Sequence, residues 1–518
     1  MRRRHFPSRA EHRLAWPAWS ACIIFCILLA AFVACAYAVS GIAPVRSSVP
    51  TMSSTQQTCQ FPGNGINIFP GRLQADDVVH HDNSSKILNW PEILSSIPTT
   101  TPTTVPTTLS DVPSQAEIAA RADAAYTEGY ARLATMQRSY QTWTIPSRPD
   151  LIAFATDAKT SGGLTGDGVT DDTAALQALL DRLPGGSTIY FPPGDYRIDG
   201  PIAITKPFTL FGEADTVFDC RRATRDVFTV NTLGSPTSMM TGMIITGIVF
   251  EGPGIETDST IIDAYFMQDL NISYIKMHNV GSTAISLSTC TDSTIESCVF
   301  DNVFKAGSGY GVCIMDRSDR ITIRDSFFVT KGRHGIATGT RNANLAPENY
   351  VREVIVDNNY FEHTTNDAVN AHAPTVGPYR IDGNVFYKCN QGVALLHGQG
   401  KIVNNVIIDA VSGVVLFREP FNSDTPPELG IDQVNQNIMI DIDWAGVEAD
   451  RSTINIRDNT IRGTGGEPGI TIDDSTHQSS IIEGNVIERV NGGIKIGSLS
   501  GVSMVNNWVN AGNGYQVY

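Results

Sequence analysis

The chain has 518 residues, of which 42% are hydrophobic and 17% are charged, so it is long enough to bury a large core. Its formal net charge of −16 argues against a nucleic-acid-binding surface. Net charge does not separate glycans from small molecules as ligands, and both classes stay open at this point.

Residues 1–43 have the composition of a targeting segment. An apolar run over residues 18–39 follows a group of arginines, which are Arg2, Arg3, Arg4, Arg9 and Arg13. The run is long enough to span a bilayer, and the flanking arginines predict a cytoplasmic N-terminus. Ala36-Tyr37-Ala38 offers a small-residue cleavage site, so secretion is the alternative to an uncleaved anchor. In either case we expect the rest of the chain to be extracytoplasmic, anchored to the membrane by one helix or secreted.

Residues 44–113 show little hydrophobic periodicity and include the tract PTTTPTTVPTT at 98–108. Because a Thr/Pro tract cannot bury a core, we interpret this segment as a linker. Ser114 and Glu117 then form a capping-box pattern, which predicts a helical segment over residues 114–149. Apolar and aromatic residues at helical spacing predict that this helix packs on the main domain. They are Tyr126, Tyr130, Leu133, Met136 and Tyr140.

The main domain, residues 150–518, opens with GDGVTDDTAALQALLDRLPGGSTIYFPPGDYRI at 166–198. Its aspartates suggest a metal site at first sight. However, Asp171 and Asp172 immediately precede an apolar helical pattern, where carboxylates accept hydrogen bonds from the free backbone N–H groups. We therefore predict that these aspartates are structural.

The stretches GDGVTDDTAALQALLD and GGSTIYFPPGDYRI resemble the opening of pectate-lyase-like proteins, which have the pectin lyase fold. This resemblance implies an all-β architecture, a right-handed parallel β-helix with an N-terminal capping helix, over about residues 150–518. The family includes polysaccharide lyases, glycoside hydrolases, uronan epimerases and phage tailspikes. The resembling segment caps the first coil, so it implies the fold and leaves the reaction open.

A repeat of the form apolar-x-x-Asn-x-apolar supports this fold independently. It places a set of asparagines in register, namely Asn359, Asn384, Asn405, Asn437, Asn459, Asn485 and Asn507. The same frame extends backwards to Ser326, Cys298, Ile275 and Ile248. One repeat per coil predicts a solenoid in which parallel strands stack and the asparagines form an internal ladder.

The strands that follow each asparagine can be superposed, with Ile285, Val312, Ile336, Val369, Val393 and Val414 pointing inward. Polar residues of successive coils then fall together at the ends of these strands: Asp316, Thr340 or Arg341, His372, His397, and Arg418 with Glu419. Just ahead of the strands lie Arg333 and His334, followed in the next coil by His363, Asn366 and Asp367. His363 and Asp367 also have a simpler interpretation as turn residues. We predict catalytic roles for His372, His397, His334, Arg333, Asp367, Arg418 and Asp316.

Such a row suits β-elimination or C5 epimerisation of a uronate-containing glycan. A cation offsets the uronate carboxylate, a role open to Arg333, Arg341 or Arg418, and a base removes the C5 proton, a role open to His372, His334 or His397. Glycoside hydrolysis is the alternative and needs two carboxyl groups. Asp316 and Asp367 are two coils apart, roughly 10 Å by stacking alone, which favours an inverting geometry.

Family motifs do not decide between these reactions. The Tyr-Gly-x-Asp-Pro-His pattern of alginate epimerases is absent, and the polygalacturonase set is not met. The sequence secures no cofactor, although a divalent cation such as calcium stays open, with His372, His397 and Asp367 as alternative metal ligands. We therefore predict a lyase or epimerase, with a hydrolase or a non-catalytic glycan-binding scaffold as alternatives. The expected partner is a polysaccharide or cell-surface glycan, with no nucleic acid, and a homotrimer is a further option.

Overall fold

The computed structural model describes residues 114–305, 307–329, 332–339, 350–371, 378–396, 399–417, 431–450, 453–464, 468–473, 480–497, 501–511 and 514–516. All of these residues lie in one compact unit. Within these ranges no helix is both long enough and apolar enough to cross a membrane. The predicted anchor, residues 1–43, and the predicted linker, residues 44–113, lie outside the described residues.

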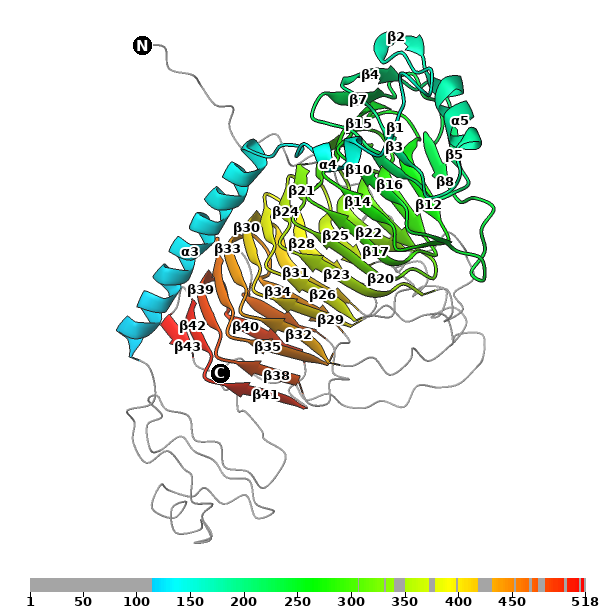
Figure 1. Cartoon of the computed structure of the whole chain (residues 1–518). Helices are drawn as coiled ribbons and strands as arrows, with labels where there is room; N and C mark the ends of the chain where they lie inside the picture. Colours follow the sequence, from blue (N-terminus) through cyan, green and yellow to red (C-terminus); the bar gives the residue numbers. More distant parts are fainter. Residues whose placement is uncertain are drawn as a thin grey trace, which may run out of the picture. The chain divides into compact units, whose positions relative to one another are not determined.

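The described chain winds into a parallel β-solenoid, as the repeat predicted (Figure 1). Each full coil contributes one strand to each of three sheets, here named A, B and C. Sheet A consists of β1 (Thr156–Asp157), β3 (Thr188–Tyr190), β6 (Thr209–Phe211), β10 (Ile244–Thr246), β14 (Asn271–Ser273), β17 (Thr291–Glu296), β20 (Asp319–Arg324), β23 (Arg352–Asp357), β26 (Tyr379–Asp382), β29 (Gly400–Val403), β32 (Asp432–Asn435), β35 (Ile454–Arg457), β38 (Ser480–Glu483) and β41 (Val502–Val505), joined at one side by β9 (Met240–Thr241) and β13 (Met267–Gln268).

Sheet B follows the same order of coils. It consists of β2 (Asp167–Asp171), β4 (Gly194–Arg197), β7 (Thr216–Asp219), β11 (Val249–Gly254), β15 (Lys276–Val280), β18 (Val299–Val303), β21 (Phe327–Val329), β24 (Tyr360–Glu362), β27 (Val385–Tyr387), β30 (Val406–Ala410), β33 (Ile438–Ile442), β36 (Thr460–Gly463), β39 (Val486–Val490), β42 (Trp508–Ala511) and β43 (Gly514–Gln516). Its pairs are parallel except for the last, in which β43 runs antiparallel to β42.

Sheet C completes the coils. It consists of β5 (Ile202–Ile204), β8 (Phe228–Val230), β12 (Thr260–Tyr265), β16 (Thr283–Ser288), β19 (Tyr310–Met315), β22 (His334–Gly339), β25 (Asp367–Ala371), β28 (Gln391–Leu395), β31 (Ser412–Phe417), β34 (Val447–Asp450), β37 (Ile470–Ile472) and β40 (Ile494–Ile496). The predicted inward residues, from Ile285 to Val414, pair in one register across this sheet and belong to the core. The frame inferred from the sequence is therefore confirmed.

The predicted asparagine ladder is present at the turn from sheet A to sheet B, and its members are buried. In each step the Oδ1 of one asparagine accepts hydrogen bonds from the Nδ2 and the backbone N–H of the asparagine one coil earlier. For Asn405 and Asn437 both distances are 3.0 Å. The residue before each ladder position adopts a left-handed conformation, as at Asn404 with φ of 55°. The ladder thus pairs polar groups that a buried turn would otherwise leave unsatisfied.

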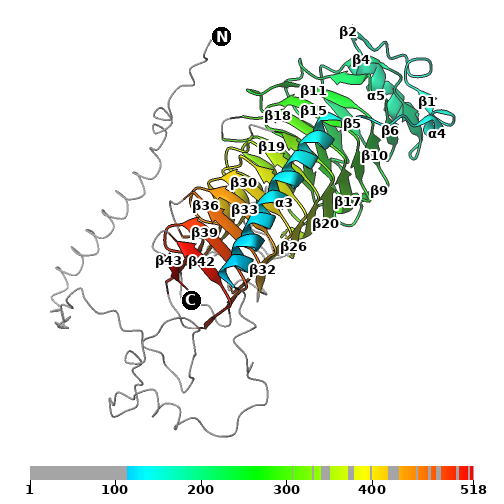
Figure 2. The same ribbon diagram turned by 90° about the vertical axis from the view of Figure 1, so that its left-hand side faces the viewer.

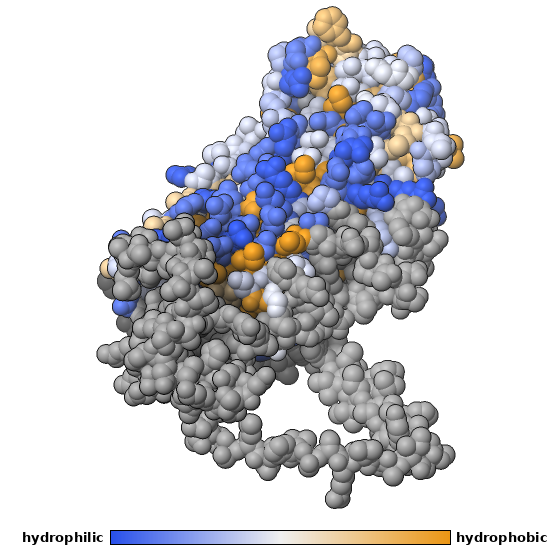
Figure 3. Space-filling view, turned by 90° about the horizontal axis from the view of Figure 1, so that it is seen from below, coloured by the Kyte–Doolittle hydropathy of each residue, from blue (hydrophilic) through white to orange (hydrophobic). Residues whose placement is uncertain are grey.

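Helix α3 (Gln115–Gln141) lies along the outside of sheet B, parallel to the solenoid axis (Figure 2). Ser114 caps it through the predicted capping box with Glu117. Leu133 packs among outward-facing residues that pair from coil to coil, namely Val299, Phe327, Tyr360, Val385, Val406 and Ile438. On the face shown in Figure 3, by contrast, hydrophilic residues predominate. The helix therefore covers an apolar row of sheet B and packs on the main domain, as the sequence predicted.

The N-terminal coils carry two short helices, α4 (Pro149–Ile152) and α5 (Thr173–Arg182). Leu176, Leu179 and Leu180 of α5 are buried in the core of the first coils. Asp171 accepts a hydrogen bond from the backbone N–H of Thr173, as predicted for a helix start. Asp172 does not cap the helix with its side chain, because its carboxylate instead accepts the backbone N–H groups of Thr165 and Gly166. Asp172 thus fixes the preceding loop, which is still a structural role.

We expect the ladder to contribute strongly to stability. Asn437→Ala removes a buried amide that bonds to Asn405, Asn459 and backbone carbonyls, and leaves those groups unsatisfied. The free energy of unfolding should fall by about 2 to 3 kcal/mol, measured by chemical denaturation. Asn455→Ala is the matched control, because Asn455 is half-buried on sheet A and outside the ladder; its effect should stay near 0.5 kcal/mol. Equal losses in both variants would contradict the assignment.

Candidate active site on sheet C

Three consecutive coils bring the first residues of β19, β22 and β25 into one row. Tyr310 pairs with His334, and the pair Ile336–Val369 two residues later places His334 beside Asp367. Neighbouring coils are about 4.8 Å apart, so side chains of adjacent coils in this row can touch. Residues far apart in sequence thus become neighbours at the start of the sheet C strands.

Close packing behind this row fixes the direction of its side chains. Gly311 and Gly335 follow Tyr310 and His334, and both face the interior. A β-carbon on Gly311 would lie 2.7 Å from the ring of Phe328, and one on Gly335 would lie 2.6 Å from Phe361. These rings belong to a stack on sheet B with centroids 4.7 Å apart. The backbone therefore lies against the ring stack at the second residue of each strand, which leaves the first residue to face away from the core.

His334 is held by two neighbours in the row. Its Nδ1 lies 3.1 Å from the backbone oxygen of Asp367 and 3.5 Å from Asp367 Oδ2. Its ring stacks on Tyr310 with the centroids 5.6 Å apart and the planes 10° from parallel. Because a carbonyl oxygen can only accept a hydrogen bond, the neutral imidazole carries its proton on Nδ1. The basic lone pair is then on Nε2, and the imidazole is oriented as a general base requires.

Asp367 is 4% exposed, and Asn370 Nδ2 donates a hydrogen bond to its Oδ2. Burial raises the pKa of the Asp367 carboxyl to about 6, because the charged form loses its hydration. The hydrogen bond from Asn370 and the positive charge of Arg333 limit this rise. The carboxyl group therefore changes its charge close to neutral pH, which is typical of groups at functional sites.

Arg333 supplies the cation of this cluster. Its Nη1 donates hydrogen bonds to the backbone oxygen of Gly307, at 3.1 Å, and to Tyr310 Oη, at 3.2 Å. The side chain is half-buried, and its charge acts on Asp367 across one coil. A guanidinium in this position can bind a carboxylate, because its planar N–H groups match the two oxygens.

The structure brings three of the predicted residues together, namely Arg333, His334 and Asp367. His372, His397 and Arg418 lie outside the described residues, as does Arg341, so their placement in the row stays a prediction. His363 is exposed at a turn with φ of 60°, beside Glu362, which fits its simpler interpretation.

Asp316 lies elsewhere, and the predicted hydrolytic pair with Asp367 was wrong. Asp316 follows the last residue of β19 and accepts a hydrogen bond from the hydroxyl of Ser288. Asp367 aligns with the first residue of that strand, so the two carboxyl groups are separated by the strand length, roughly 20 Å, in addition to two coil spacings. Coil stacking alone accounts for only the smaller part of the distance between the two carboxyl groups.

Tyr310 and Asn370 are the members of the cluster that the sequence interpretation missed. Tyr310 occupies the same position in its strand as His334, so comparing first residues across coils would have found it. Asn370 faces outward directly after the inward Val369, in register with Ala337 and Ala394. A polar residue between alanines at the same position of the two adjacent coils could have identified Asn370 from the sequence.

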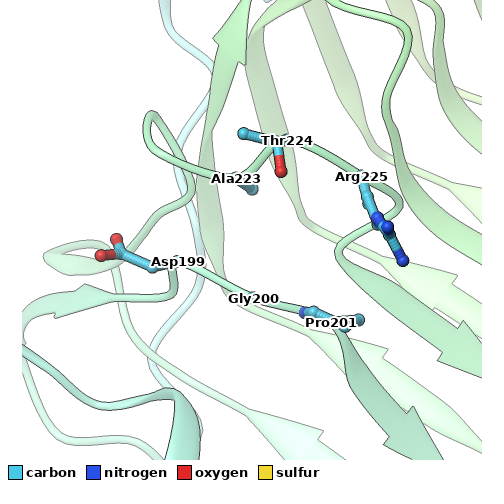
Figure 4. A pocket seen from close by; sticks show the side chains of 6 residues that line it. All are labelled: Asp199, Gly200, Pro201, Ala223, Thr224 and Arg225. Atoms are coloured by element: carbon cyan, nitrogen blue, oxygen red, sulfur yellow. The ribbon is translucent and has the colours of Figure 1, made fainter.

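The described residues also contain a cavity of about 210 Å³ in the first coils, lined by Asp199, Gly200, Pro201, Ala223, Thr224 and Arg225 (Figure 4). None of the predicted catalytic residues lines it. Among the described residues no group of three or more histidine, cysteine or acidic side chains could hold a metal ion. Of the alternative metal ligands His372, His397 and Asp367, the two histidines lie outside the described residues.

The raised pKa of Asp367 predicts that the stability difference between the wild type and Asp367→Asn depends on pH. Between the ordinary value of 3.8 and about 6, the folded state binds more protons than the unfolded state, so the charge of Asp367 lowers stability as pH rises through this window. Asp367→Asn stays neutral. Relative to the wild type, its free energy of unfolding should be similar near about pH 4 and up to about 3 kcal/mol higher above about pH 7.

Chemical denaturation over this pH range measures the difference, and Asp409→Asn, which replaces an exposed aspartate, is the control for loss of a surface charge. A difference between Asp367→Asn and wild type that is constant with pH would contradict the prediction.

Comparison with known proteins identifies a family that part of this chain matches. Residues 158–394 match the family model described as Rhamnogalacturonase A/epimerase, pectate lyase-like. Mannuronan C5-epimerase AlgE1 of Azotobacter vinelandii is 55% identical over 40 residues, which cover 7% of this chain and 3% of that protein. A probable glucan endo-1,3-beta-glucosidase of Arthroderma benhamiae is 43% identical over 53 residues, which cover 10% of this chain and 6% of that protein. The matches thus span only a small part of these relatives.

Solved structures with similar folds include the Streptococcus pneumoniae surface protein and adhesin PfbA, with a TM-score of 0.49 and 15% identity over 69% of this chain and 97% of that one. The A-module of the Azotobacter vinelandii mannuronan C-5 epimerase AlgE4 gives a TM-score of 0.42 and 18% identity over 68% and 95% of the two chains. The segment 158–394, which contains Arg333, His334 and Asp367, belongs to the pectate-lyase-like family of rhamnogalacturonase A and epimerases.

Proposed function

We propose that this protein is an extracytoplasmic carbohydrate-active enzyme that removes the C5 proton of a uronate residue in a polysaccharide, as a lyase or a C5 epimerase. The observation that carries the proposal is the buried His334 imidazole, whose Nδ1 faces the backbone oxygen and carboxyl group of Asp367. A guanidinium in the same cluster, from Arg333, supplies the complementary charge for a uronate carboxylate.

Each described residue has a distinct part in the proposed reaction. His334 Nε2 accepts the C5 proton, and Asp367 orients the ring and stabilises the imidazolium that forms. Negative charge then spreads into the C6 carboxylate, where Arg333 offsets it. The interactions of Asp367 with the imidazolium and of Arg333 with the C6 carboxylate are stronger in the transition state than in the bound substrate. The reason is that both charges increase as the proton leaves C5.

Tyr310 distinguishes two outcomes of this first step. Its Oη accepts a hydrogen bond from Arg333, so its own O–H proton is available to a substrate. In elimination, the C5–H and C4–O4 bonds break, the C4=C5 double bond forms, and the leaving O4 takes the Tyr310 proton. In epimerisation, C4–O4 stays intact and solvent water supplies a proton to C5 from the opposite face, while the proton taken by His334 passes to solvent.

The described carboxyl groups give less support to hydrolysis. Hydrolysis needs two carboxyl groups about 5 to 9.5 Å apart. Asp316 lies at the other end of the strands, and among the described residues no second carboxyl group acts on the pKa of Asp367. A non-catalytic glycan-binding role is the remaining alternative and predicts binding without conversion.

Mannuronan is the first substrate to test, because curated relatives are named mannuronan C5-epimerases. Polygalacturonate and a β-1,3-glucan complete the panel. Ultraviolet absorbance of the new double bond would mark elimination, deuterium uptake at C5 in heavy water would mark epimerisation, and reducing ends alone would mark hydrolysis. Lack of all three products with retained binding would favour the scaffold alternative.

His334→Gln should lower kcat by about 100-fold or more, because the general base is lost. Arg333→Ala should lower kcat/KM by a similar factor, with partial recovery in Arg333→Lys, which keeps the charge but loses the planar fork. His363→Ala is the matched histidine control and should leave the rate unchanged, since His363 is exposed at a turn. Full activity of His334→Gln would refute the proposed base.

A further inference from the structure

Asn370 carries a polar atom that the proposed reaction does not use. The residue is 3% exposed and its Nδ2 donates to Asp367, but its Oδ1 is buried and has no hydrogen-bond partner among the described residues. A buried carbonyl oxygen that has lost water and gained no donor is costly, and native proteins contain few of them. Such an atom in a candidate active site is a ready acceptor for a ligand.

The outward neighbours of Asn370 in the two adjacent coils have small side chains. Its register partners on the outward face are Ala337 in the preceding coil and Ala394 in the following one. Neither side chain extends beyond its β-carbon, so the Asn370 amide stands between two short side chains. Asn435 and Asn455 also have unpartnered Oδ1 atoms, but both residues are only half-buried and lie on sheet A. The nearly complete burial and the contact with Asp367 set Asn370 apart from them.

We propose that Asn370 is a substrate-binding residue whose Oδ1 accepts a hydrogen bond from a hydroxyl group of the sugar held at the His334–Asp367 cluster. This assignment rests on the proposed function. An amide oxygen attracts O–H groups and repels a carboxylate, whereas the Arg333 guanidinium attracts the carboxylate. The two residues therefore bind different groups of a uronate: Arg333 binds the carboxylate and Asn370 binds a hydroxyl group. Together they orient C5 relative to His334.

A purely positioning role is the competing explanation. Through Nδ2, Asn370 could serve only to hold the Asp367 carboxyl group. The two roles separate in the Asp367→Asn background, where the protein retains the shape of the site and turnover does not obscure binding. If Asn370 acts only through the Asp367 carboxylate, the substitution Asn370→Ala should not change saccharide affinity further in a protein that already carries Asp367→Asn.

Binding of short mannuronan and polygalacturonate oligosaccharides to the full-length protein, measured by calorimetry, tests this. We expect Asp367→Asn/Asn370→Ala to bind about tenfold more weakly than Asp367→Asn, the effect of one hydrogen bond with its acceptor removed. Asp367→Asn/Asn435→Ala is the matched control and should bind as Asp367→Asn does. Equal affinity of all three variants would overturn the assignment and leave the proposed function standing.

Thermal unfolding without saccharide gives a second, independent measurement. The substitution Asn370→Ala removes no hydrogen bond of Oδ1 and at most the one that Nδ2 donates to residue 367, so the double variant should be less stable than Asp367→Asn by no more than one hydrogen bond, about 1 kcal/mol. A clearly larger loss of stability would show that the Asn370 oxygen stabilises the fold, and would overturn the assignment. If the wild type neither binds nor converts either oligosaccharide, the proposed function fails, and the role of Asn370 fails with it.

Discussion

Coil-to-coil register is the constraint on which the rest of this structure depends. A parallel solenoid has no hairpins to set its pairing, and a slip by one residue would turn every side chain of a strand to the other face. The asparagine ladder prevents such a slip, because each amide bonds both the side chain and the backbone of its neighbour, as between Asn405 and Asn437. In the two coils that precede the ladder, Ser326 continues this pattern, because its backbone N–H donates to Asn359 Oδ1 and its Oγ accepts the backbone N–H of Cys298. The strands of sheet C therefore begin at corresponding positions, and Tyr310, His334 and Asp367 become neighbours.

The chemistry of the cluster follows from where the strands begin. Gly311 and Gly335 allow the chain to approach the phenylalanine stack, which leaves the preceding residue at the edge of the core. His334 and Asp367 at this edge are buried and therefore largely removed from water. The Asp367 carboxyl group is therefore more basic than usual, while the Nδ1–H of His334 is fixed by a backbone oxygen. Fold and reactivity thus derive from the same close packing.

Much of the fold could be predicted from the sequence because it rests on local periodicity. The Ser114–Glu117 capping box is visible in a short window, and the repeated asparagines and the inward aliphatic residues from Ile285 to Val414 lie in short motifs that recur once per coil. The candidate site was predictable only in part. Register placed His334 near Asp367, but the distance to Asp316 depends on strand length, and the role of Asp172 depends on a loop that folds back onto it. Burial of Asn370 and stacking of Tyr310 are properties of the assembled coils, which no single window contains.

Helix α3 makes contacts between parts of the chain that lie far apart in sequence, which an ordinary repeat protein lacks. Three helical residues rise about 4.5 Å, close to one coil spacing of about 4.8 Å, so the helix advances in step with the coils it covers. Ile118 packs with Val486 and Trp508 near the end of the solenoid, whereas Trp143 donates a hydrogen bond to Ser297 near its middle. In a repeat array each coil depends only on its neighbours, and terminal coils can fray. Here a segment that precedes the first coil in sequence holds the last ones, so the structure can close only after the whole chain has been synthesised.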